Sequence, residues 1–283
     1  MKTDTSFNSI KQILGEPYYS DERVILYNMD SISALSKLVD KNFTSFDLTV
    51  TSPPYNIGKS YEQVKTTDEY VEWSKSWFDV VYKTTQKNGS FWLNIGYMPV
   101  KNIGKAVPLP YLLWDKTKFF LIQEIIWNYG AGVAARKSLS PRNEKILWYV
   151  KNADEYTFNL DSIRDPNVKY PNQKKNGKLR VNPLGKNPSD VWQIPKVTSG
   201  KNRSSKERVD HPAQTPIELF KRIILAGSNP EDLVLDPFIG SGTTAVAAKN
   251  LDRYVVGFDV NADFLDIAIN RIKNEKISVQ PIF

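Results

Sequence analysis

The sequence predicts an α/β fold in which a mostly parallel sheet is covered by helices on both faces. Short apolar segments alternate along the chain with segments whose apolar residues recur at helical spacing, a pattern typical of such sheets. Two of the apolar segments run directly into turns rich in proline or glycine, after Thr51 and after Asp236. The chain has 283 residues, which is enough for one large α/β domain with an extended insertion or for two modest domains.

The first half of the chain supplies four predicted strands, at residues 47–51, 90–95, 119–129 and 145–151. Between the first two strands, Thr66 and Glu69 have the spacing of a capping box and predict the start of a helix. That helix is expected to end at Asn88-Gly89. A further helical segment is expected around residues 111–118.

Periodicity largely disappears from residue 152 to 210 and returns near Thr215. Thr215 and Glu218 again have capping-box spacing, with Pro216 at the first helical position. A strand at 233–236, a helix at 243–250, a strand at 254–259 and a helix capped by Asn261 follow. We therefore expect a body formed by residues 1–151 and 211–283, with residues 152–210 as an insert.

Composition excludes several classes of site. The chain has no cysteine, so disulfides and thiolate metal sites are ruled out, and its single histidine argues against a histidine-based metal centre. No metal is therefore expected. The sequence also lacks an apolar run of the roughly 20 residues that cross a bilayer, and its N-terminus lacks the pattern of a signal peptide. These features predict a soluble cytoplasmic protein that has no membrane partner.

Positive charge is concentrated in the insert. Residues 164–208 contain 12 Lys and Arg against 3 Asp and Glu, a local excess of +9, whereas the whole chain has a net charge of +7. A basic segment on a near-neutral body is typical of a protein that binds a polyanion, although a solubilising loop explains the charge equally well. The candidate DNA-binding residues of the insert are Lys174, Lys175, Lys178, Arg180, Lys201, Arg203 and Arg208, and Arg136 and Arg142 flank a second candidate loop.

A glycine-rich turn follows the strand that ends at Asp236. Gly240 and Gly242 allow the backbone to turn sharply and to approach a ligand closely. Asp259 ends the next strand, about 20 residues later, where the ribose hydroxyls of a nucleoside lie in a doubly wound fold. The motif lacks the Gly-Lys-Ser/Thr of a P-loop and the third glycine of a dinucleotide site. A nucleoside without a pyrophosphate fits better, and a plain tight turn is the alternative.

A proline-rich loop follows the other apolar strand. Pro53 and Pro54 each fix one φ angle and remove one N–H donor. The rigid carbonyl of Pro53 and the hydroxyl of Ser52 are then two acceptors, placed to bind both hydrogens of an exocyclic amine. Tyr55 offers a flat face on which an extruded base can stack. A strand that simply ends at prolines is the alternative.

Together the two motifs resemble those of the DNA amino-methyltransferase family. Residues Ser52–Tyr55 fit its acceptor motif, (Asp/Asn/Ser)-Pro-Pro-Tyr/Phe, and Asp236–Thr243 fit its cofactor motif, Asp-Pro-Phe-x-Gly-Ser-Gly-Thr. The acceptor motif comes first here, which is the permuted order of the family's β group. Residues 211–216 resemble the segment before the family's cofactor strand, and the resemblance covers nearly the whole chain except roughly residues 152–205.

The resemblance implies a Rossmann-like fold, with a mostly parallel seven-stranded sheet, one antiparallel strand and an inserted target-recognition region at 152–210. It implies S-adenosyl-L-methionine as the cofactor and places the strands that end at Thr51 and Asp236 side by side. Asp30 resembles the aspartate of the family's Gly-Asp pair, although Met29 replaces the glycine. The cofactor residues implied are Asp30, Asp236, Pro237, Phe238, Gly240, Ser241, Gly242, Thr243 and Asp259, and the catalytic ones are Ser52, Pro53, Pro54 and Tyr55.

Direct methyl transfer to an exocyclic amine of a base in double-stranded DNA is the expected reaction. Without a cysteine nucleophile, the covalent route to C5 of cytosine is closed. Ser52 resembles the N4-cytosine branch, whereas adenine enzymes mostly carry Asp there, so N6 of adenine remains the alternative target. A catalytically silent nucleic-acid-binding protein and a methyltransferase for RNA or protein amides are further alternatives. The sequence specifies neither the recognition site nor the oligomeric state, for which a homodimer is one option, nor a companion restriction endonuclease.

Overall fold

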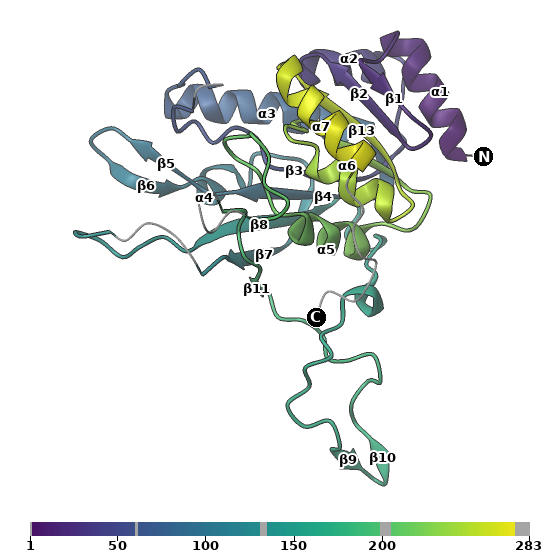
Figure 1. Ribbon diagram of the computed structural model, residues 1–283, viewed down its shortest axis with the longest axis vertical. Coiled ribbons are helices and arrows are strands. Elements are labelled where there is room, and N and C mark those ends of the chain that lie inside the picture. The colour runs from purple at the N-terminus through teal and green to yellow at the C-terminus, as the bar shows by residue number, and fades with distance from the viewer. Residues whose placement is uncertain (1, 60–61, 131–134, 199–204, 275–283) are drawn as a thin grey trace.

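The protein folds as a nine-stranded sheet with helices on both faces, as a computed structural model of the chain shows (Figure 1). The structure describes residues 2–59, 62–130, 135–198 and 205–274. The strand order across the sheet is β1-β2-β13-β12-β3-β4-β8-β7-β11. Its strands are β1 (Tyr19–Ser20), β2 (Val24–Asn28), β3 (Phe46–Thr51), β4 (Thr85–Ile95), β7 (Phe120–Asn128), β8 (Asn143–Val150), β11 (Val191–Gln193), β12 (Leu233–Asp236) and β13 (Tyr254–Asp259).

The central seven strands, from β2 to β7, confirm the predicted mostly parallel sheet. Of these seven, β8 alone runs opposite to the others, pairing antiparallel with both β4 and β7. Two short edge strands that the sequence did not predict extend the sheet. Strand β1 pairs antiparallel with β2, and β11, from the insert, pairs parallel with β7.

Helices cover the two faces because alternate residues of the strands point in opposite directions. Val24 and Leu26 of β2 pack toward α5, α6 and α7, whereas Ile25 and Tyr27 pack toward α1, α2, α3 and α4. The helices are α1 (Lys2–Leu14), α2 (Ser31–Asp40), α3 (Thr67–Thr84), α4 (Leu109–Leu113), α5 (Ile217–Gly227), α6 (Thr243–Asn250) and α7 (Ala262–Asn274), with a short 3-10 helix at Leu160–Ile163.

Three predicted helix boundaries differ from the structure. Helix α3 has the predicted Thr66–Glu69 capping box but ends at Thr84, and Asn88-Gly89 lies inside β4. Helix α4 occupies residues 109–113 rather than 111–118. Helix α5 has no capping box: Pro216 is the N-cap, and the first backbone N–H, that of Ile217, donates to the Glu207 carboxylate at 3.1 Å. A carboxylate from the insert has replaced the local cap, which no local pattern can predict. Asn261 accepts from the backbone of Asp263, as expected.

The insert forms an arm that reaches away from the body (Figure 1). Asp165 and Lys186 close the base of this arm through two backbone hydrogen bonds of 3.0 and 2.9 Å and an ion pair of 3.0 Å. At its far end β9 (Lys174–Lys175) and β10 (Lys178–Leu179) form a short hairpin. We call residues 165–186 the arm. After the arm the chain returns to the body and forms β11.

A second small hairpin, β5 (Tyr97–Val100) with β6 (Gly104–Pro108), extends from the end of β4. Three tryptophans bind β11 to the core: Trp92 stacks on Trp148 at 4.7 Å and on Trp192 at 6.3 Å between ring centroids. They come from β4, β8 and β11, so the end of the insert belongs to the same hydrophobic core as the catalytic body. No described helix combines the length and hydropathy needed to span a lipid bilayer.

Candidate active site

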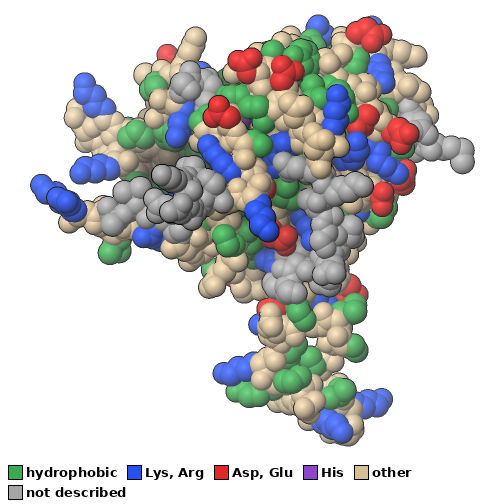
Figure 2. Space-filling view, in the orientation of Figure 1, with side chains coloured by type: hydrophobic (Ala, Val, Ile, Leu, Met, Phe, Trp, Pro, Cys, Tyr) green, Lys and Arg blue, Asp and Glu red, His purple; other side chains and the backbone are tan. Residues whose placement is uncertain are grey.

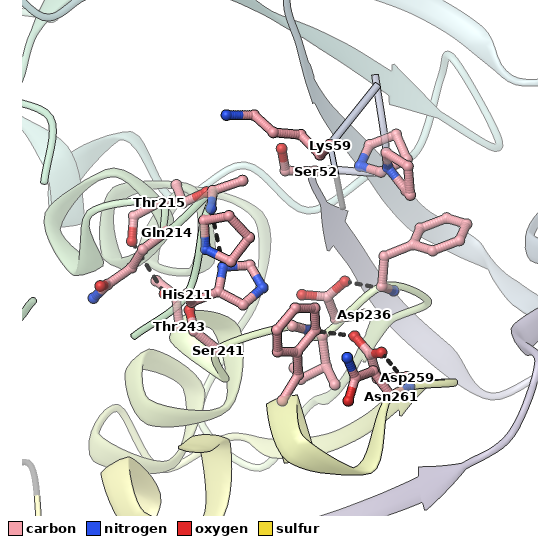
Figure 3. A pocket seen from close by; sticks show the side chains of 18 of the residues that line it. Ser52, Lys59, His211, Gln214, Thr215, Asp236, Ser241, Thr243, Asp259 and Asn261 are labelled. Carbon is pink, nitrogen blue, oxygen red and sulfur yellow. Dashed lines mark hydrogen bonds between the residues drawn. The ribbon is translucent and has the colours of Figure 1, made fainter. Parts of the chain in front are cut away.

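A cavity of about 940 Å³ opens where strands β2, β3, β12 and β13 end. Because these four strands are parallel, the loops that follow them meet at one edge of the sheet. Figure 3 shows side chains from these loops converging on one space, with Ser52 and Lys59 on one side and Asp259 and Asn261 on another. The predicted site residues that line the cavity are Asp30, Ser52, Pro53, Pro54, Tyr55, Arg208, Asp236, Pro237, Phe238, Gly240, Ser241, Thr243 and Asp259.

The acceptor and glycine-rich motifs are joined directly by a side-chain hydrogen bond. Strands β3 and β12 are paired, as predicted, and the Thr51 hydroxyl donates to the Asp236 carboxylate at 2.5 Å. Thr244, at the start of α6, donates to the other carboxylate oxygen, also at 2.5 Å. Burial raises the pKa of Asp236 to about 6. Asp236 therefore fixes the two loops relative to each other.

Asp259 holds the glycine-rich turn at the end of β13. Its carboxylate accepts from the backbone N–H of Gly240 at 3.0 Å and of Asn261 at 2.8 Å. Each carboxylate oxygen keeps a further lone pair, which suits a ribose hydroxyl. Phe238 lies nearby as a half-buried ring, packed on Trp73 and Trp77 at centroid distances of 5.5 and 5.2 Å. This end of the cavity therefore fits an adenosyl group, which needs a flat apolar surface and hydroxyl acceptors.

The two glycines of the turn have different roles. Gly240 (φ +47°) lines the cavity, and a Cβ there would lie 3.0 Å from Nε2 of His211. Gly242 (φ +77°) does not line the cavity, in contrast to the prediction. A Cβ at Gly242 would lie 2.6 Å from Cβ of Ala268 in α7. Gly242 is the N-cap of α6, so its small size allows α6 and α7 to pack closely.

His211 is buried against this turn and remains neutral. Its Nδ1 accepts from the backbone N–H of Ala213 at 3.2 Å, and its ring packs edge-on against Phe264 at 4.4 Å. Burial, together with the positive charges of Arg208 and Arg271, lowers the pKa of His211 to about 4. The His211 side chain lies in the wall of the cavity (Figure 3).

A hydrogen-bond network lies behind the acceptor loop. The hydroxyls of Ser52 and Tyr55 are 2.9 Å apart, and the Tyr55 hydroxyl donates to Oε2 of Glu144 at 2.9 Å. The side-chain amide of Asn94 donates to the Tyr55 hydroxyl at 2.9 Å and to the same Glu144 oxygen at 3.0 Å. The Tyr55 ring fits because Gly96 has no side chain, as a Cβ there would lie 3.0 Å from the ring. We call Ser52, Tyr55, Asn94 and Glu144 the hydroxyl network.

Sequence reasoning missed Asn94 and Glu144, as well as Glu62. Asn94 and Glu144 lie on the antiparallel strands β4 and β8, outside any motif. Glu62 follows the acceptor loop and accepts from the backbone N–H groups of Tyr55 and Ile57 at 2.9 and 2.8 Å, which fixes the loop. No local signal distinguishes Glu144, because it lies between Asn143 and Lys145 among the polar first residues of β8, before the apolar part of that strand.

The predicted DNA-binding residues fall into three groups. Lys174, Lys175, Lys178 and Arg180 are exposed on the arm, and Figure 2 shows Lys and Arg side chains at its tip. Arg208 is half-buried and lines the cavity. Arg136 is exposed, whereas Arg142 is half-buried. Lys201 and Arg203 lie outside the described residues. Two cations that sequence reasoning missed, Lys59 and Lys196, also line the cavity.

No group of three or more histidine, aspartate or glutamate side chains in the described ranges is arranged to hold a metal ion.

The doubly wound sheet brings the acceptor loop and the glycine-rich turn into one cavity, and the family comparison identifies the class as DNA methyltransferase. The chain belongs to the N6/N4 methyltransferase family, described as DNA methylases, whose sequence profile matches residues 46–270. It is 57% identical over 276 residues to the Type II methyltransferase M.ScaI of Streptomyces caespitosus, covering 98% of this chain and 90% of that protein. It is 31% identical over 264 residues to the DNA adenine methyltransferase YhdJ of Escherichia coli (strain K12), covering 90% of this chain and 84% of that protein.

Solved structures share the fold. The PvuII DNA methyltransferase (cytosine-N4-specific) matches with a TM-score of 0.70 and 21% identity, covering 93% of this chain and 91% of that chain. The complex of M1.HpyAVI with SAM matches with a TM-score of 0.58 and 22% identity, covering 88% of this chain and 98% of that chain. Both similarities cover most of this chain, so the chain shares the methyltransferase fold over most of its length.

Proposed function

We propose that this DNA methyltransferase transfers a methyl group from S-adenosyl-L-methionine to the exocyclic N4 of cytosine, at a specific site in double-stranded DNA. The observation that carries the proposal is the shared cavity, in which Ser52 and the glycine-rich turn lie around one space and are joined through Thr51 and Asp236. Holding donor and acceptor in one geometry supplies up to roughly 7–11 kcal/mol of the barrier in well-oriented reactions.

The cofactor would be held between β12 and β13. Asp259 would accept from the ribose hydroxyls, and Phe238 would provide the flat surface for the adenine. Ser241, Thr243 and His211, on the opposite wall, would face the methionine part. Asp30 caps α2 by accepting from Ser33 at 2.9 Å, so it would contribute to adenine binding from the helix start. The relative M1.HpyAVI, solved with SAM, supports this cofactor.

Cytosine is favoured over adenine because the first acceptor is a hydroxyl. Ser52 and the Pro53 carbonyl would accept the two amine hydrogens and free the nitrogen lone pair, while Tyr55 stacks on the extruded base. The Ser-Pro-Pro-Tyr motif resembles that of the N4-cytosine branch, and the acceptor-first order resembles that of the permuted β group. The match to a cytosine-N4-specific enzyme agrees with that choice. N6 of adenine remains the second candidate, because a 31% identical relative is named an adenine methyltransferase.

Contact with DNA would come from the arm and from the rim of the cavity. Lys174, Lys175, Lys178 and Arg180 project where they can reach phosphates, whereas Arg208 and Lys196 lie near the reacting base. Arg136 and Arg142 flank the loop between β7 and β8, on the same side as the hydroxyl network. A role in a restriction-modification system, with a companion endonuclease, follows from the similarity to a Type II methyltransferase.

The deciding experiment incubates the purified protein with unmethylated DNA and labelled S-adenosyl-L-methionine and identifies the modified nucleosides by mass spectrometry. N4-methylcytosine is the expected product. N6-methyladenine would support the proposed methyl transfer to an exocyclic amine and refute cytosine as the target base. The absence of any methylated base, with cofactor bound and DNA of varied sequence, would overturn the proposed function.

A further inference from the structure

Glu144 lies where a proton released at Ser52 can reach it through one intermediate hydroxyl. The path runs from the Ser52 Oγ to the Tyr55 hydroxyl over 2.9 Å and on to Glu144 Oε2 over a further 2.9 Å. Tyr55 donates to the carboxylate, so the Ser52 hydroxyl is left to donate to Tyr55. All donors then point toward Glu144, and the lone pairs of Ser52 remain available to an amine in the cavity.

Proton removal is required by the proposed reaction. When the amine nitrogen forms its bond to the methyl carbon, the carbon–sulfur bond breaks with its electron pair retained on sulfur. The nitrogen then carries a positive charge until one of its protons leaves. A serine hydroxyl and a backbone carbonyl are too weak as bases to keep that proton. A carboxylate within reach of Ser52 is needed to accept it.

Three of the other carboxylates that line the cavity already accept hydrogen bonds from groups of the protein. Asp236 accepts from Thr51 and Thr244, and Asp259 accepts from two backbone N–H groups at the cofactor end. Glu62 accepts three backbone N–H groups of the acceptor loop. Among the described residues that line the cavity, Glu144 is the carboxylate hydrogen-bonded to the Tyr55 hydroxyl.

We propose that Tyr55 and Glu144 form a proton relay for the methyl transfer, an inference that rests on the proposed function. One amine proton passes to Ser52 Oγ, the Ser52 proton to Tyr55 and the Tyr55 proton to Glu144, which ends protonated and later releases its proton to water. Glu144 touches no substrate in this arrangement. It positions the two hydroxyls and accepts the proton. The same relay would operate whether the target is N4 of cytosine or N6 of adenine.

The electrostatics of the site suit this role. Burial raises the pKa of Glu144 above its ordinary value, which makes the carboxylate a better base, while hydrogen bonds from Tyr55 and Asn94 and the charge of Lys196 keep it ionisable. Burial and the neighbouring Glu144 charge raise the pKa of Tyr55 well above its usual range, so Tyr55 retains its own proton at rest. Tyr97 and Tyr129, which also face Glu144, have raised pKa values and stay neutral near pH 7.

The test measures single-turnover methyl transfer from pH 5 to 8.5 for the wild type, Glu144→Gln, Tyr55→Phe and the double variant. We expect each single variant to lose on the order of 10²-fold in rate, with dissociation constants for DNA and S-adenosyl-L-methionine within about twofold. Wild-type activity should fall on the acid side as Glu144 becomes protonated, and this acid limb should be absent in Glu144→Gln. The double variant should be no slower than the slower single one, because both residues act in one chain.

Glu155→Gln is the matched control, because Glu155 is exposed and forms a surface ion pair with Lys87 at 2.9 Å. It should leave the rate and the pH profile unchanged. An acid limb in Glu144→Gln that keeps the wild-type midpoint and depth belongs to another group, such as Asp236 with its raised pKa, and overturns the relay. So does a double variant whose loss is the product of the two single losses.

Tyr55→Phe keeps the test decisive if Glu144→Gln misfolds. It removes the hydroxyl that links Ser52 to Glu144 and leaves the buried carboxylate in place. If Glu144→Gln does not fold, an unchanged rate in Tyr55→Phe overturns the relay by itself. A wild-type protein that methylates no DNA refutes the proposed function. A wild type that methylates DNA, with variants that match it in rate and pH profile, refutes the relay alone.

Discussion

In the proposed reaction Ser52 would accept from the substrate amine while its hydroxyl stays hydrogen-bonded to the hydroxyl of Tyr55. Its neighbours hold it: Tyr55 lies at 2.9 Å and the Asn94 amide at 3.4 Å. We predict that Ser52→Ala lowers kcat/KM on the order of 10²-fold, since one stabilising group at the reacting atom is lost. Steady-state kinetics with a methylatable DNA duplex and equilibrium cofactor binding check this. Ser76→Ala, which changes an exposed serine on α3, is the control, and a cofactor affinity reduced as strongly as kcat/KM would contradict the assigned role.

His211 should make the free energy of unfolding depend on pH. Its pKa is about 4 in the folded protein, below the ordinary value of 6.5, so the unfolded chain binds more protons between these values. Stability from His211 is therefore complete above pH 6.5 and declines by about 2 kcal/mol as the pH falls to 5. Urea unfolding at several pH values, for the wild type and His211→Gln, measures it.

Over part of this range, Asp236 contributes stability that increases as the pH falls, opposite to His211, because the pKa of Asp236 is raised to about 6 in the folded protein. The absolute slope of stability against pH therefore mixes the two residues. The difference between the wild type and His211→Gln isolates His211, and equal slopes for the two proteins would show that the histidine is solvated.

At the residue scale, motif reasoning identified side chains that lie in loops and missed those that lie in strands. The motifs identified three side chains in loops or at strand ends: Ser52, Tyr55 and Asp259. There the local geometry can be predicted from nearby prolines and glycines and from the spacing of the residues. Glu144 and Asn94 meet only because β4 and β8 are antiparallel neighbours in a specific register. A single sequence does not contain that register, so their role could not be predicted from it.

At the scale of elements, the contact between helices α6 and α7 depends on Gly242. A Cβ there would lie 2.6 Å from the Ala268 side chain, and the φ of +77° already disfavours any other residue. We predict that Gly242→Ala lowers the free energy of unfolding by roughly 2–4 kcal/mol, the sum of overpacking and backbone strain. Thermal and urea unfolding check it.

Gly15→Ala separates the two contributions to that loss. Gly15 has a φ of +84° but no atom within 4 Å of an added Cβ, so it reports backbone strain alone. We expect about 1 kcal/mol there. Equal losses in the two variants would mean that the helices adjust freely and that packing against Ala268 is unimportant.

Elements were predicted well where periodicity and local caps agree, as in β3, α6, β12 and β13. The boundaries of elements were predicted poorly where a residue far away in the sequence determines where the element starts or ends. Helix α5 begins after Pro216 because Glu207, from the insert, receives the N–H of Ile217. Helix α3 ends before Asn88-Gly89 because the chain pairs with β3 from Thr85 onward, and tertiary pairing overrides the turn propensity of Asn-Gly.

For the whole molecule, the distribution of charge predicts how binding responds to salt. If Lys174, Lys175 and Lys178 contact phosphates, replacing all three by alanine should reduce the slope of log Kd against log salt by up to about 2.7. Fluorescence anisotropy with a short duplex between 50 and 300 mM salt measures the slope. Alanine at Lys41, Lys75 and Lys118 removes the same charge elsewhere and is the control. An arm variant with the wild-type slope would remove the arm from the DNA interface.

Six of the central seven strands were predicted by residue range, and the family resemblance supplied the mostly parallel sheet and the pairing of β3 with β12, whereas β2 was not predicted. The two edge strands were not predicted either. Strand β1 has two residues and β11 has three, which is too few to show a periodic pattern in the sequence. Strand β11 is held by the stacking of Trp192 on Trp92, a contact that forms only in the folded protein.

Because Asp165 and Lys186 close the base of the arm, the segment between them can be exchanged for a segment of another length or shape. Because its two ends already meet, a change in its length does not displace the sheet, and each doubling of such a loop costs only about 0.6 kcal/mol in closure entropy. If the arm contacts DNA as proposed, a differently shaped segment between Asp165 and Lys186 would change which DNA is bound. The cavity would keep its structure, so target choice could diverge while the reaction centre is inherited intact.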